Sequence, residues 1–450
     1  MTRTLGVIVL AAGQGTRMIS TLPKVLHSVC GVPMASHILS AARELAPQRI
    51  AIVVGHEAAQ VRDALASDDI TFVEQTELVG TADAVRRCRD AMAGCDDVMV
   101  LNGDSPLIRP ELLRELRDTR ALSDPFAFVT CRIDDPGRLG RVLRDSNGLV
   151  ERIVEAADYE GPPGPAEINA GQYIFDAARL WAGIIQVPMS ARGEYYLTDM
   201  VALAVSTWTP PATIEADPAE ALGVDDRVKL AEAERIMRAR ILERHMLAGV
   251  TITDPATTYI NATVQIAPDV TILPNCSLSG LTEVATGCRI GPGTTLSNAR
   301  LGRDTCVRNS VVEDSRVGER VQVGPFAHLR GNAVIGDDCE IGNYAEVKNS
   351  VIGNRVKMHH FSYMGDADVG DETNIAAGVI TCNYDGVKKY RTTIGRHVFI
   401  GCDTMLVAPV TLGDDSVTGA GSVVTKDVRP GGKVAGVPAR AIPHVKRPGS

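Results

Sequence analysis

The chain has 450 residues, 45% hydrophobic and 22% charged, which is ordinary for a water-soluble globular protein. A chain of this length is too long to fold around a single hydrophobic core, so we expect two or three domains. The net charge of −9 argues against a basic nucleic-acid footprint, and no apolar run is long enough to cross a bilayer. We therefore expect a cytoplasmic protein that binds neither nucleic acid nor membrane, with its ten cysteines as thiols.

The first strand is predicted at residues 5–10, LGVIVL, which are continuously apolar like a buried parallel strand. It runs into the Gly-rich segment AAGQGTRM at 11–18, and Pro23 and Lys24 follow. A strand that ends in a Gly-rich turn places backbone N–H groups where a phosphate can accept from them. The glycine spacing is neither that of a P-loop nor that of a dinucleotide fold. The segment therefore predicts a phosphate-binding loop of another class.

Helices and strands then alternate. Helices are predicted at 34–45, at 58–65 and from residue 80 onward, where Thr81 is the expected N-cap. Strands are predicted at 50–54, 71–74 and 98–101. This order indicates a mostly parallel, doubly wound Rossmann-like α/β sheet that binds ligands at the carboxyl ends of its strands. Asp104 follows the strand at 98–101 and so lies at such an end.

The string LAAGxGTRM followed by Pro-Lys resembles the sugar-1-phosphate nucleotidyltransferases. The resemblance implies that Arg17 and Lys24 are catalytic cations at the reacting phosphates and that Asp104 ligates Mg²⁺. A second Mg²⁺ ligand is implied by GVDDR at 223–227, where Asp225 replaces the family's usual Asn and also contacts the nucleotide. The residues implied to wrap the nucleoside triphosphate are Leu10, Ala11, Ala12, Gly13 and Lys24.

Four more segments resemble the enzymes that make UDP-N-acetylglucosamine: LGR at 139–141, IVE at 153–155, EINAG at 167–171 and GEYYLTD at 193–199. The resemblance implies UTP and N-acetylglucosamine-1-phosphate as substrates. A sugar phosphate is already anionic at neutral pH, so it needs no protein base to attack the α-phosphorus of UTP. The implied amino-sugar contacts are Gly140, Glu155 and Asn169, and the implied uracil contacts are Gln75, Gly80 and Thr81.

An apolar stripe predicts a helix from Asp225 to about His245, because Leu230, Ala233 and Ile241 recur at helical spacing. We interpret this helix as a linker between two domains. The predicted division is a uridylyltransferase domain at 1–225, the linker helix at 226–248 and a second domain at 249–450, for which the resemblance described below implies an acetyltransferase.

Beyond residue 250 the apolar period becomes six. Evenly spaced residues, many followed by Gly, are Val317, Val323, Leu329, Ile335, Ile341 and Val347. This is the hexapeptide repeat of a parallel β-helix, with three hexads a turn and room for about ten coils. Cys276, Cys288 and Cys339 fall where the repeat needs small inward residues. Families with this repeat have left-handed helices and are typically trimers, so the resemblance implies a homotrimer.

One segment, 381–392, lacks the repeat and is expected to leave the coil as a cationic loop with Lys388, Lys389 and Arg391. Breaks in a solenoid often map to its binding face. Two stretches before this segment and one that runs into it resemble the acetyltransferase half of the bifunctional GlmU family: KMHHFSYMGD at 357–366, Asn374, and ITCNYDG at 380–386.

This resemblance implies that His360 is the general base, with His359 as the alternative, and that acetyl-CoA is the acetyl donor. An imidazole with an unperturbed pKa near ~6.5 can take the proton of a glucosamine ammonium at neutral pH. Cys402 stands where the family more often has Ser. The implied glucosamine-1-phosphate contacts are Arg330, Lys348, Tyr363 and Asn374. The implied acetyl-CoA contacts are Ala377, Asn383, Tyr384, Cys402 and Ala420.

The leading hypothesis is a bifunctional enzyme that acetylates glucosamine-1-phosphate and then couples the product to UMP, supplying precursors of peptidoglycan and lipopolysaccharide. The alternative is a single-activity sugar-1-phosphate nucleotidyltransferase whose β-helix serves regulation or assembly. A non-catalytic assembly subunit is a third class, and the intact Arg17, Lys24 and Asp104 argue against it.

Overall fold

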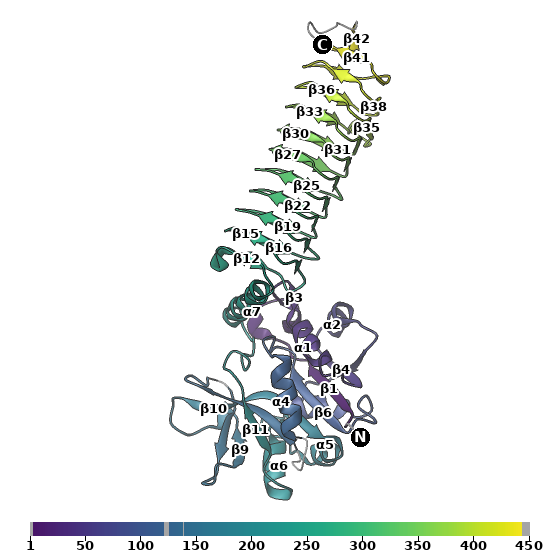
Figure 1. Cartoon of the computed structure of the whole chain (residues 1–450). Helices are drawn as coiled ribbons and strands as arrows, with labels where there is room; N and C mark the ends of the chain where they lie inside the picture. The colour runs from purple at the N-terminus through teal and green to yellow at the C-terminus, as the bar shows by residue number, and fades with distance from the viewer. Residues whose placement is uncertain (1–2, 121–125, 138, 443–450) are drawn as a thin grey trace. The chain divides into compact units, whose positions relative to one another are not determined.

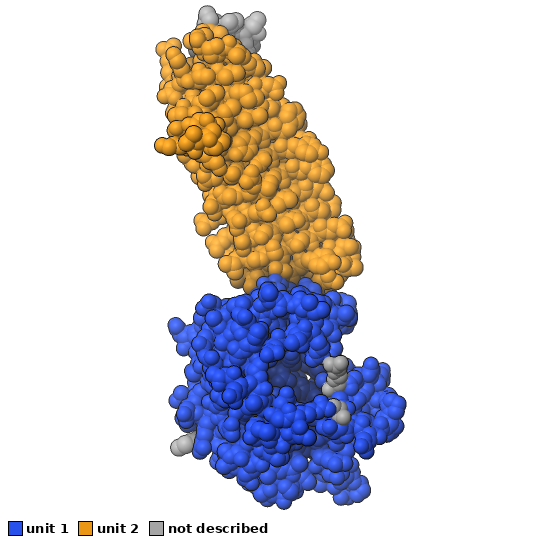
Figure 2. All heavy atoms as spheres, turned by 180° about the vertical axis from the view of Figure 1, so that it is seen from behind, with its two compact units in different colours: residues 1–237 blue, residues 238–450 orange. Residues whose placement is uncertain are grey.

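The structure is a computed structural model that describes residues 3–120, 126–137 and 139–442 (Figure 1). The chain forms two compact units, Met1–Met237 and Arg238–Ser450, coloured separately in Figure 2. The division into 1–225, 226–248 and 249–450 stays a prediction. No helix within the described residues combines the length and the apolarity that crossing a bilayer requires.

Unit 1 is built on one twisted sheet with the strand order β11-β7-β10-β6-β1-β4-β5. All neighbours on this path are parallel except β10, which runs antiparallel to β6 and β7. The predicted mostly parallel sheet is confirmed. Its strands are β1 (Leu5–Leu10), β4 (Arg49–Val54), β5 (Ile70–Glu74), β6 (Asp97–Asn102), β7 (Phe126–Ile133), β10 (Ala166–Asp176) and β11 (Ala212–Glu215), with β8 (Arg141–Arg144) and β9 (Val150–Val154) paired beside β10 and the short pair β2 (Ser28–Val29) and β3 (Val32–Pro33) separate.

Helices cover both faces of this sheet. Successive residues of a strand point to opposite faces, and Val7 and Ile8 accordingly belong to two different hydrophobic clusters. One cluster includes residues of α1 and α4, and the other includes residues of α3, α5 and α6. The helix predicted at 34–45 ends two residues early, at Arg43. The helices of unit 1 are α1 (Met34–Arg43), α2 (Ala58–Leu65), α3 (Thr81–Arg87), α4 (Pro110–Arg120), α5 (Ala177–Gly183) and α6 (Asp199–Thr207), with 3₁₀ turns η1 (Thr16–Met18), η2 (Lys24–Leu26), η3 (Ala156–Asp158) and η4 (Ile184–Gln186).

The prediction that Thr81 caps α3 is wrong. Gly80 is the N-cap residue, with φ +107°, and Thr81 is already helical. A Cβ on residue 80 would lie 2.3 Å from the carbonyl oxygen of Tyr195, so only glycine allows this approach. The Thr81 hydroxyl instead accepts a hydrogen bond from the Leu197 amide at 2.9 Å. A tertiary contact therefore sets where this helix begins.

The predicted linker helix is present as α7 (Arg227–Leu247), which begins two residues after Asp225. Ala233 and Ile241 of the predicted stripe are buried, as is Leu242. The Glu234 carboxylate accepts a hydrogen bond from the Cys30 amide at 2.5 Å.

Unit 2 is a left-handed parallel β-helix of hexapeptide repeats, as predicted. Short strands stack into three sheets, and the stacked coils are visible in Figure 1. The inward positions of the repeat, such as Leu329, Ile341 and Val347, are buried, and so are Cys276 and Cys339. Cys288 is likewise buried. A 3₁₀ turn, η5 (Pro255–Thr257), lies in the first coil.

The three sheets of the β-helix are named by their lengths. The twelve-stranded sheet holds β12 (Thr251–Ile252), β15 (Thr271–Ile272), β18 (Arg289–Ile290), β21 (Cys306–Val307), β24 (Gln322–Val323), β27 (Glu340–Asn343), β30 (Lys357–His360), β33 (Asn374–Ile375), β36 (Phe399–Ile400), β39 (Val417–Thr418), β41 (Lys433–Ala435) and β42 (Arg440–Ala441). The ten-stranded sheet holds β13 (Tyr259–Ile260), β16 (Ser277–Ser279), β19 (Thr295–Ser297), β22 (Val311–Glu313), β25 (His328–Arg330), β28 (Glu346–Lys348), β31 (Tyr363–Gly365), β34 (Ile380–Cys382), β37 (Met405–Val407) and β40 (Val423–Val424). The nine-stranded sheet holds β14 (Gln265–Ile266), β17 (Glu283–Val284), β20 (Arg300–Leu301), β23 (Arg316–Val317), β26 (Val334–Ile335), β29 (Val351–Ile352), β32 (Ala367–Val369), β35 (Thr392–Ile394) and β38 (Val410–Leu412).

The predicted loop leaves the coil between β34 and β35. It is shorter than expected at both ends, because Thr381 and Cys382 belong to β34 and Thr392 to β35. The Asp385 carboxylate accepts hydrogen bonds from two backbone amides within the loop, which gives the tip a defined turn.

Candidate active sites

The Gly-rich loop of unit 1 opens into a cavity of about 320 Å³ at the carboxyl ends of the strands. The Gly103 amide donates to the Leu10 carbonyl at 2.9 Å, and the Ala11 amide donates to the Val53 carbonyl at 2.9 Å. These bonds hold the loop against the neighbouring strands. The predicted nucleotide residues that line the cavity together are Leu10, Ala11, Ala12, Gly13, Lys24, Gln75, Gly80 and Thr81, and Asp104 lines it as well.

Two further cavities share residues with the first. One of about 600 Å³ is lined by Lys24, Asp104, Arg17, Gly140, Glu155, Asn169 and Asp225. Another of about 220 Å³ is lined by Leu10, Thr81, Glu155, Asn169, Tyr173, Tyr196 and Thr198. All the residues predicted for the nucleotide, the amino sugar and the metal in unit 1 therefore line cavities that adjoin one another. Figure 2 shows that one face of this unit is hollowed.

Each predicted catalytic cation of unit 1 pairs with a predicted metal ligand. The Lys24 ammonium pairs with Asp104, and the Arg17 guanidinium pairs with Asp225. Lys229 of α7 lies 3.0 Å from the other Asp225 oxygen. Burial disfavours the charged form of Asp225, but Lys229, Arg17 and Lys24 outweigh it and lower the pKa of this carboxyl. Asp225 is therefore an anion at neutral pH.

Asp104 and Asp225 fit the ligand set of Mg²⁺, which takes one or two carboxylates and fills its other positions with water and phosphate oxygens. The part of the chain that the structure describes contains no group of three or more His, Cys, Asp or Glu side chains placed to hold a metal ion.

On the predicted sugar side, the Glu155 carboxylate accepts a hydrogen bond from the Thr198 hydroxyl at 2.9 Å. The Asn169 amide donates to the Tyr173 hydroxyl at 2.6 Å. Burial raises the pKa of Asp199, and the Glu155 carboxylate raises it further. The sequence did not single out Thr198 or Tyr173. Thr198 lies within the GEYYLTD string, so position in a motif could have found it, whereas Tyr173 carried no such signal.

In unit 2, predicted site residues form a column along the carboxyl ends of successive strands of the twelve-stranded sheet. Met358, Ile375, Ile400 and Thr418 are successive register partners. The residues two positions after them are His360, Ala377, Cys402 and Ala420.

Backbone hydrogen bonds link each of these coils to the next. The Gly378 amide donates to the His360 carbonyl, the Asp403 amide to the Ala377 carbonyl, and the Gly421 amide to the Cys402 carbonyl. The predicted base and three predicted acetyl-CoA contacts thus follow one line along the β-helix. Past His360 the line consists of small side chains, and Cys402 is exposed.

The predicted phosphate contacts lie in the ten-stranded sheet, where Arg330 and Lys348 are register partners. Arg330 also pairs with Glu346 at 2.5 Å. Contact with Lys389 of the loop, together with the charge of Arg330, lowers the pKa of Lys348. A bound anion such as a phosphate would offset the repulsion between these neighbouring cations. Lys389 was noted in the sequence only as a loop cation, because nothing local relates it to Lys348.

Three other predicted contacts differ in their settings. Tyr363 is the register partner of Glu346, one coil from the Arg330 pair. Asn374 is the register partner of Lys357 in β30. Asn383 is only 8% exposed and donates to the Asp366 carboxylate at 2.5 Å.

The remaining loop contact, Tyr384, is 60% exposed, and its hydroxyl donates to the Gly386 carbonyl at 2.6 Å. The loop is thus anchored at Asn383 and open at Tyr384.

The two adjacent histidines have different partners. The His360 Nδ1 lies 2.9 Å from the Asn343 Oδ1 in the neighbouring strand β27. The His359 Nε2 lies 2.7 Å from a Glu340 carboxylate oxygen in the same strand. His359 is therefore engaged with a carboxylate through its Nε2. The Nε2 of His360 makes no hydrogen bond or ion pair with any residue that the structure describes.

Two family models match the chain. The MobA-like NTP transferase domain matches residues 7–163. The bacterial transferase hexapeptide model matches residues 314–349 and 391–426.

Curated relatives match nearly the whole chain. A protein named "Bifunctional protein GlmU" from Pelobacter propionicus is 44% identical over 450 residues, covering 98% of this chain and 97% of its own. Proteins of the same name from a Nostoc species and from Streptococcus mutans are each 43% identical and cover 94% of this chain. They are covered over 94% and 93% of their own lengths, respectively.

Proposed function

The chain belongs to the GlmU family, and from this premise we propose which residues of each unit carry its two activities. It is a bifunctional enzyme of UDP-N-acetylglucosamine synthesis, an acetyltransferase and a uridyltransferase that acts on small molecules and serves cell-wall formation. This reading is favoured over a single-activity nucleotidyltransferase, because the relatives match through the β-helix as well as unit 1.

For unit 1 we propose that UTP and N-acetylglucosamine-1-phosphate bind in the adjoining cavities. A phosphate oxygen of the sugar attacks the α-phosphorus of UTP, and the bond to the leaving pyrophosphate breaks. Lys24 and Arg17 exchange their carboxylate partners for phosphate oxygens and offset the charge that gathers there. Asp104 and Asp225 would hold Mg²⁺, which supplies further charge neutralisation on the phosphates.

The nucleotide and sugar would be positioned by the rest of the cavity lining. The Gly-rich loop and Gln75 face the nucleotide, and Glu155 and Asn169 face the amino sugar. What supports this division is that Gly13 and Gln75 line the first cavity and Glu155 and Asn169 line the second. Lys24 and Asp104 line both.

For unit 2 we propose that His360 takes a proton from the ammonium of glucosamine-1-phosphate, whose phosphate lies against Arg330, Lys348 and Lys389. The free amine attacks the thioester carbonyl of acetyl-CoA, so that a C–N bond forms and the C–S bond breaks. The imidazolium returns its proton to the leaving CoA thiolate, and the surplus N–H proton of the new amide passes to solvent. The observation that carries this proposal is the column from His360 through Ala377, Cys402 and Ala420.

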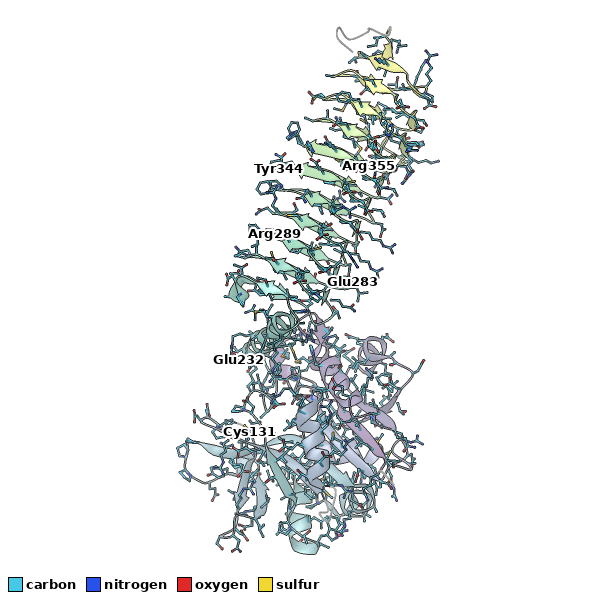
Figure 3. All side chains as sticks on the ribbon, viewed as in Figure 1. Cys131, Glu232, Glu283, Arg289, Tyr344 and Arg355 are labelled. Carbon is cyan, nitrogen blue, oxygen red and sulfur yellow. The ribbon has the colours of Figure 1, made fainter. Side chains whose placement is uncertain are left out.

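We propose a homotrimer. Its support is the hexapeptide repeat and an aromatic stack on an outer corner of the coils. Phe326 and Tyr344 stack at 5.2 Å, each more than half exposed, and Phe361 is also 60% exposed. Tyr344 projects outward from its coil (Figure 3). All three have positive φ, which is uncommon for aromatic residues. A cytoplasmic location stays a prediction.

To test the residue assignments, the wild type, His360→Ala and Asp104→Ala are each given glucosamine-1-phosphate, acetyl-CoA, UTP and Mg²⁺. The rates of acetylation and of uridylation are then measured. We expect His360→Ala to lower the acetylation rate by at least about 100-fold, the lower end of the usual contribution of a general base. The same variant should still uridylate supplied N-acetylglucosamine-1-phosphate at the wild-type rate. Asp104→Ala should show the reverse pattern.

His359→Ala is the matched control for the neighbouring histidine, and we expect it to retain acetylation. If His360→Ala acetylated normally while His359→Ala did not, His359 would be the base. If both variants acetylated normally, neither histidine would be.

A further inference from the structure

Asn343 is the one side chain of the described residues that contacts the imidazole of His360 by a hydrogen bond. The two residues are register partners on strands β27 and β30, which are each four residues long, whereas most strands of this sheet have two. The Asn343 carbonyl also accepts from the Phe361 amide at 3.0 Å. Asn343 thus holds the ring of His360 with its side chain and the following residue with its backbone.

The direction of this hydrogen bond decides which ring nitrogen can act as a base. The contact runs from the Nδ1 of His360 to the amide oxygen of Asn343, which can only accept. Nδ1 must therefore carry the proton, and a neutral imidazole with its proton on Nδ1 has its lone pair on Nε2. The opposite tautomer would leave Nδ1 as the basic nitrogen, pointed at Asn343 and not at a substrate.

We propose that Asn343 is a positioning residue that keeps the proton of His360 on Nδ1, so that Nε2 receives the proton of the substrate ammonium. The inference rests on the proposed role of His360 as the base. Asn343 does not touch the substrate in this proposal and acts only through the imidazole.

An amide suits this task better than a carboxylate would. A carboxylate also accepts from Nδ1–H, but its negative charge favours the imidazolium and raises the pKa of a histidine beside it. A base that is already protonated at neutral pH cannot accept the substrate's proton. The neighbouring His359 has the carboxylate partner, Glu340, and His360 has the uncharged one.

Titratable side chains near His360 could also contribute to the pH dependence of kcat for acetyl transfer. On β27 and β30 the other titratable side chains are Glu340, Lys357 and His359. The next strand, β33, contributes Asn374 and Ile375, neither of which titrates. A change confined to Asn343 therefore leaves the charged residues of these three strands unaltered.

The experiment measures kcat and KM for acetyl transfer from pH 6 to about 9 in Asn343→Ala and Asn343→Asp. The check on folding is the circular-dichroism melting curve of each variant, because uridylation reports on unit 1 and Asn343 lies in unit 2. We expect Asn343→Ala to lower kcat roughly 10- to 100-fold at every pH, a loss like that seen when the outer hydrogen-bond partner of a metal-bound histidine is removed. The KM for glucosamine-1-phosphate should change less than about twofold, because the substrate is not contacted.

Asn343→Asp separates positioning from packing. It keeps an acceptor for Nδ1–H but adds a charge, so the acidic limb of kcat should move up by about one pH unit. Activity should therefore be low at pH 7 and return towards the wild-type value near pH 9, where Asn343→Ala does not recover. Glu340→Gln is the matched control, since it alters the partner of His359, and its profile should match the wild type.

Two results would overturn the inference. One is an Asn343→Ala enzyme with wild-type kcat. The other is an Asn343→Asp profile whose acidic limb stays at the wild-type pH, which would indicate that Asn343 has a structural role only. These differ from a failure of the proposed function itself, in which His360→Ala would retain acetylation whatever Asn343 does.

Discussion

Asp225 illustrates how much a single side chain carries in unit 1. It pairs with Arg17 and Lys229, it begins the segment that leads into α7, and it lines the same cavity as Asp104. The nearby cations lower its pKa, so it is charged at any pH used to assay the enzyme. An asparagine there would keep an oxygen for a metal but remove the charge.

We therefore expect Asp225→Asn to raise the Mg²⁺ concentration needed for half-maximal uridylation at least about fivefold. This factor corresponds to the ~1 kcal/mol that two unit charges 4 Å apart gain in water. At saturating Mg²⁺ the rate should recover to within about threefold of the wild type, and acetylation should not change. The measurement is a Mg²⁺ titration of the initial rate.

Asp226→Asn is the control, because its carboxylate accepts from the Lys229 amide and belongs to no cavity lining described above. If Asp226→Asn changed the Mg²⁺ requirement as much as Asp225→Asn, the effect would come from the start of α7 and not from a metal ligand.

At the scale of elements, the strand pair β27–β30 is the part of the β-helix shaped most closely around the proposed base. Gly342 lies between Ile341, which points inward, and Asn343. A Cβ on Gly342 would lie 2.1 Å from the carbonyl oxygen of His359 and 2.7 Å from its Cα. The two strands approach each other more closely here than any other residue type allows.

We expect Gly342→Ala to push β30 outward and reduce acetyl transfer by at least about tenfold, because displacing a base by an ångström can cost 100-fold. Uridylation should stay at the wild-type level. The measurement is kcat for each activity, with the melting temperature of each variant recorded beside it.

Gly353→Ala is the control, because it introduces a similar steric clash elsewhere in the β-helix. Its Cβ would lie 2.5 Å from the Asp371 carboxylate and 2.8 Å from the Asp371 amide nitrogen. A similar loss of acetylation in Gly353→Ala would mean that any crowded glycine in the β-helix abolishes activity. Displacement of β30 would then not be the cause of the loss in Gly342→Ala.

At the scale of the whole molecule, each unit has a core of its own. The cores of unit 1 lie on the two faces of its sheet, and the core of unit 2 is the row of inward residues along the β-helix. Met99 of β6 and Leu406 of β37 are both fully buried, one in each core. A substitution that leaves a cavity in one core therefore removes packing contacts within that core only.

We accordingly expect Leu406→Ala and Met99→Ala to have opposite effects on heat inactivation. Each removes a buried side chain at a cost of about 2–5 kcal/mol to its own unit. After heating to graded temperatures, Leu406→Ala should lose acetylation several degrees below the wild type and keep uridylation, and Met99→Ala should do the opposite. Loss of both activities together in both variants would show that the two units unfold as one.

Much of this protein was predictable from the sequence because its strongest signals are local. The apolar run at 5–10, the strand–helix alternation and the six-residue period each depend on neighbouring positions, and each gave the element the structure contains. Motif strings carried the candidate site residues as well, because the residues of a loop that binds a phosphate are close in the chain. The Gly-rich loop and the segment around His360 were both found in this way.

Only the tertiary structure decided the contacts between segments far apart in the chain. The start of α3 depends on Gly80 against Tyr195, and the cation cluster depends on Lys389 reaching Lys348. Asn343 lies 17 residues before His360, and one turn of the β-helix brings the two side chains together. No local pattern marks such pairs, because the coil length that aligns them is set by the stacking of whole turns. The sequence thus determined which chemical groups the chain carries, and the stacking of its coils determined which nitrogen of His360 is left to act.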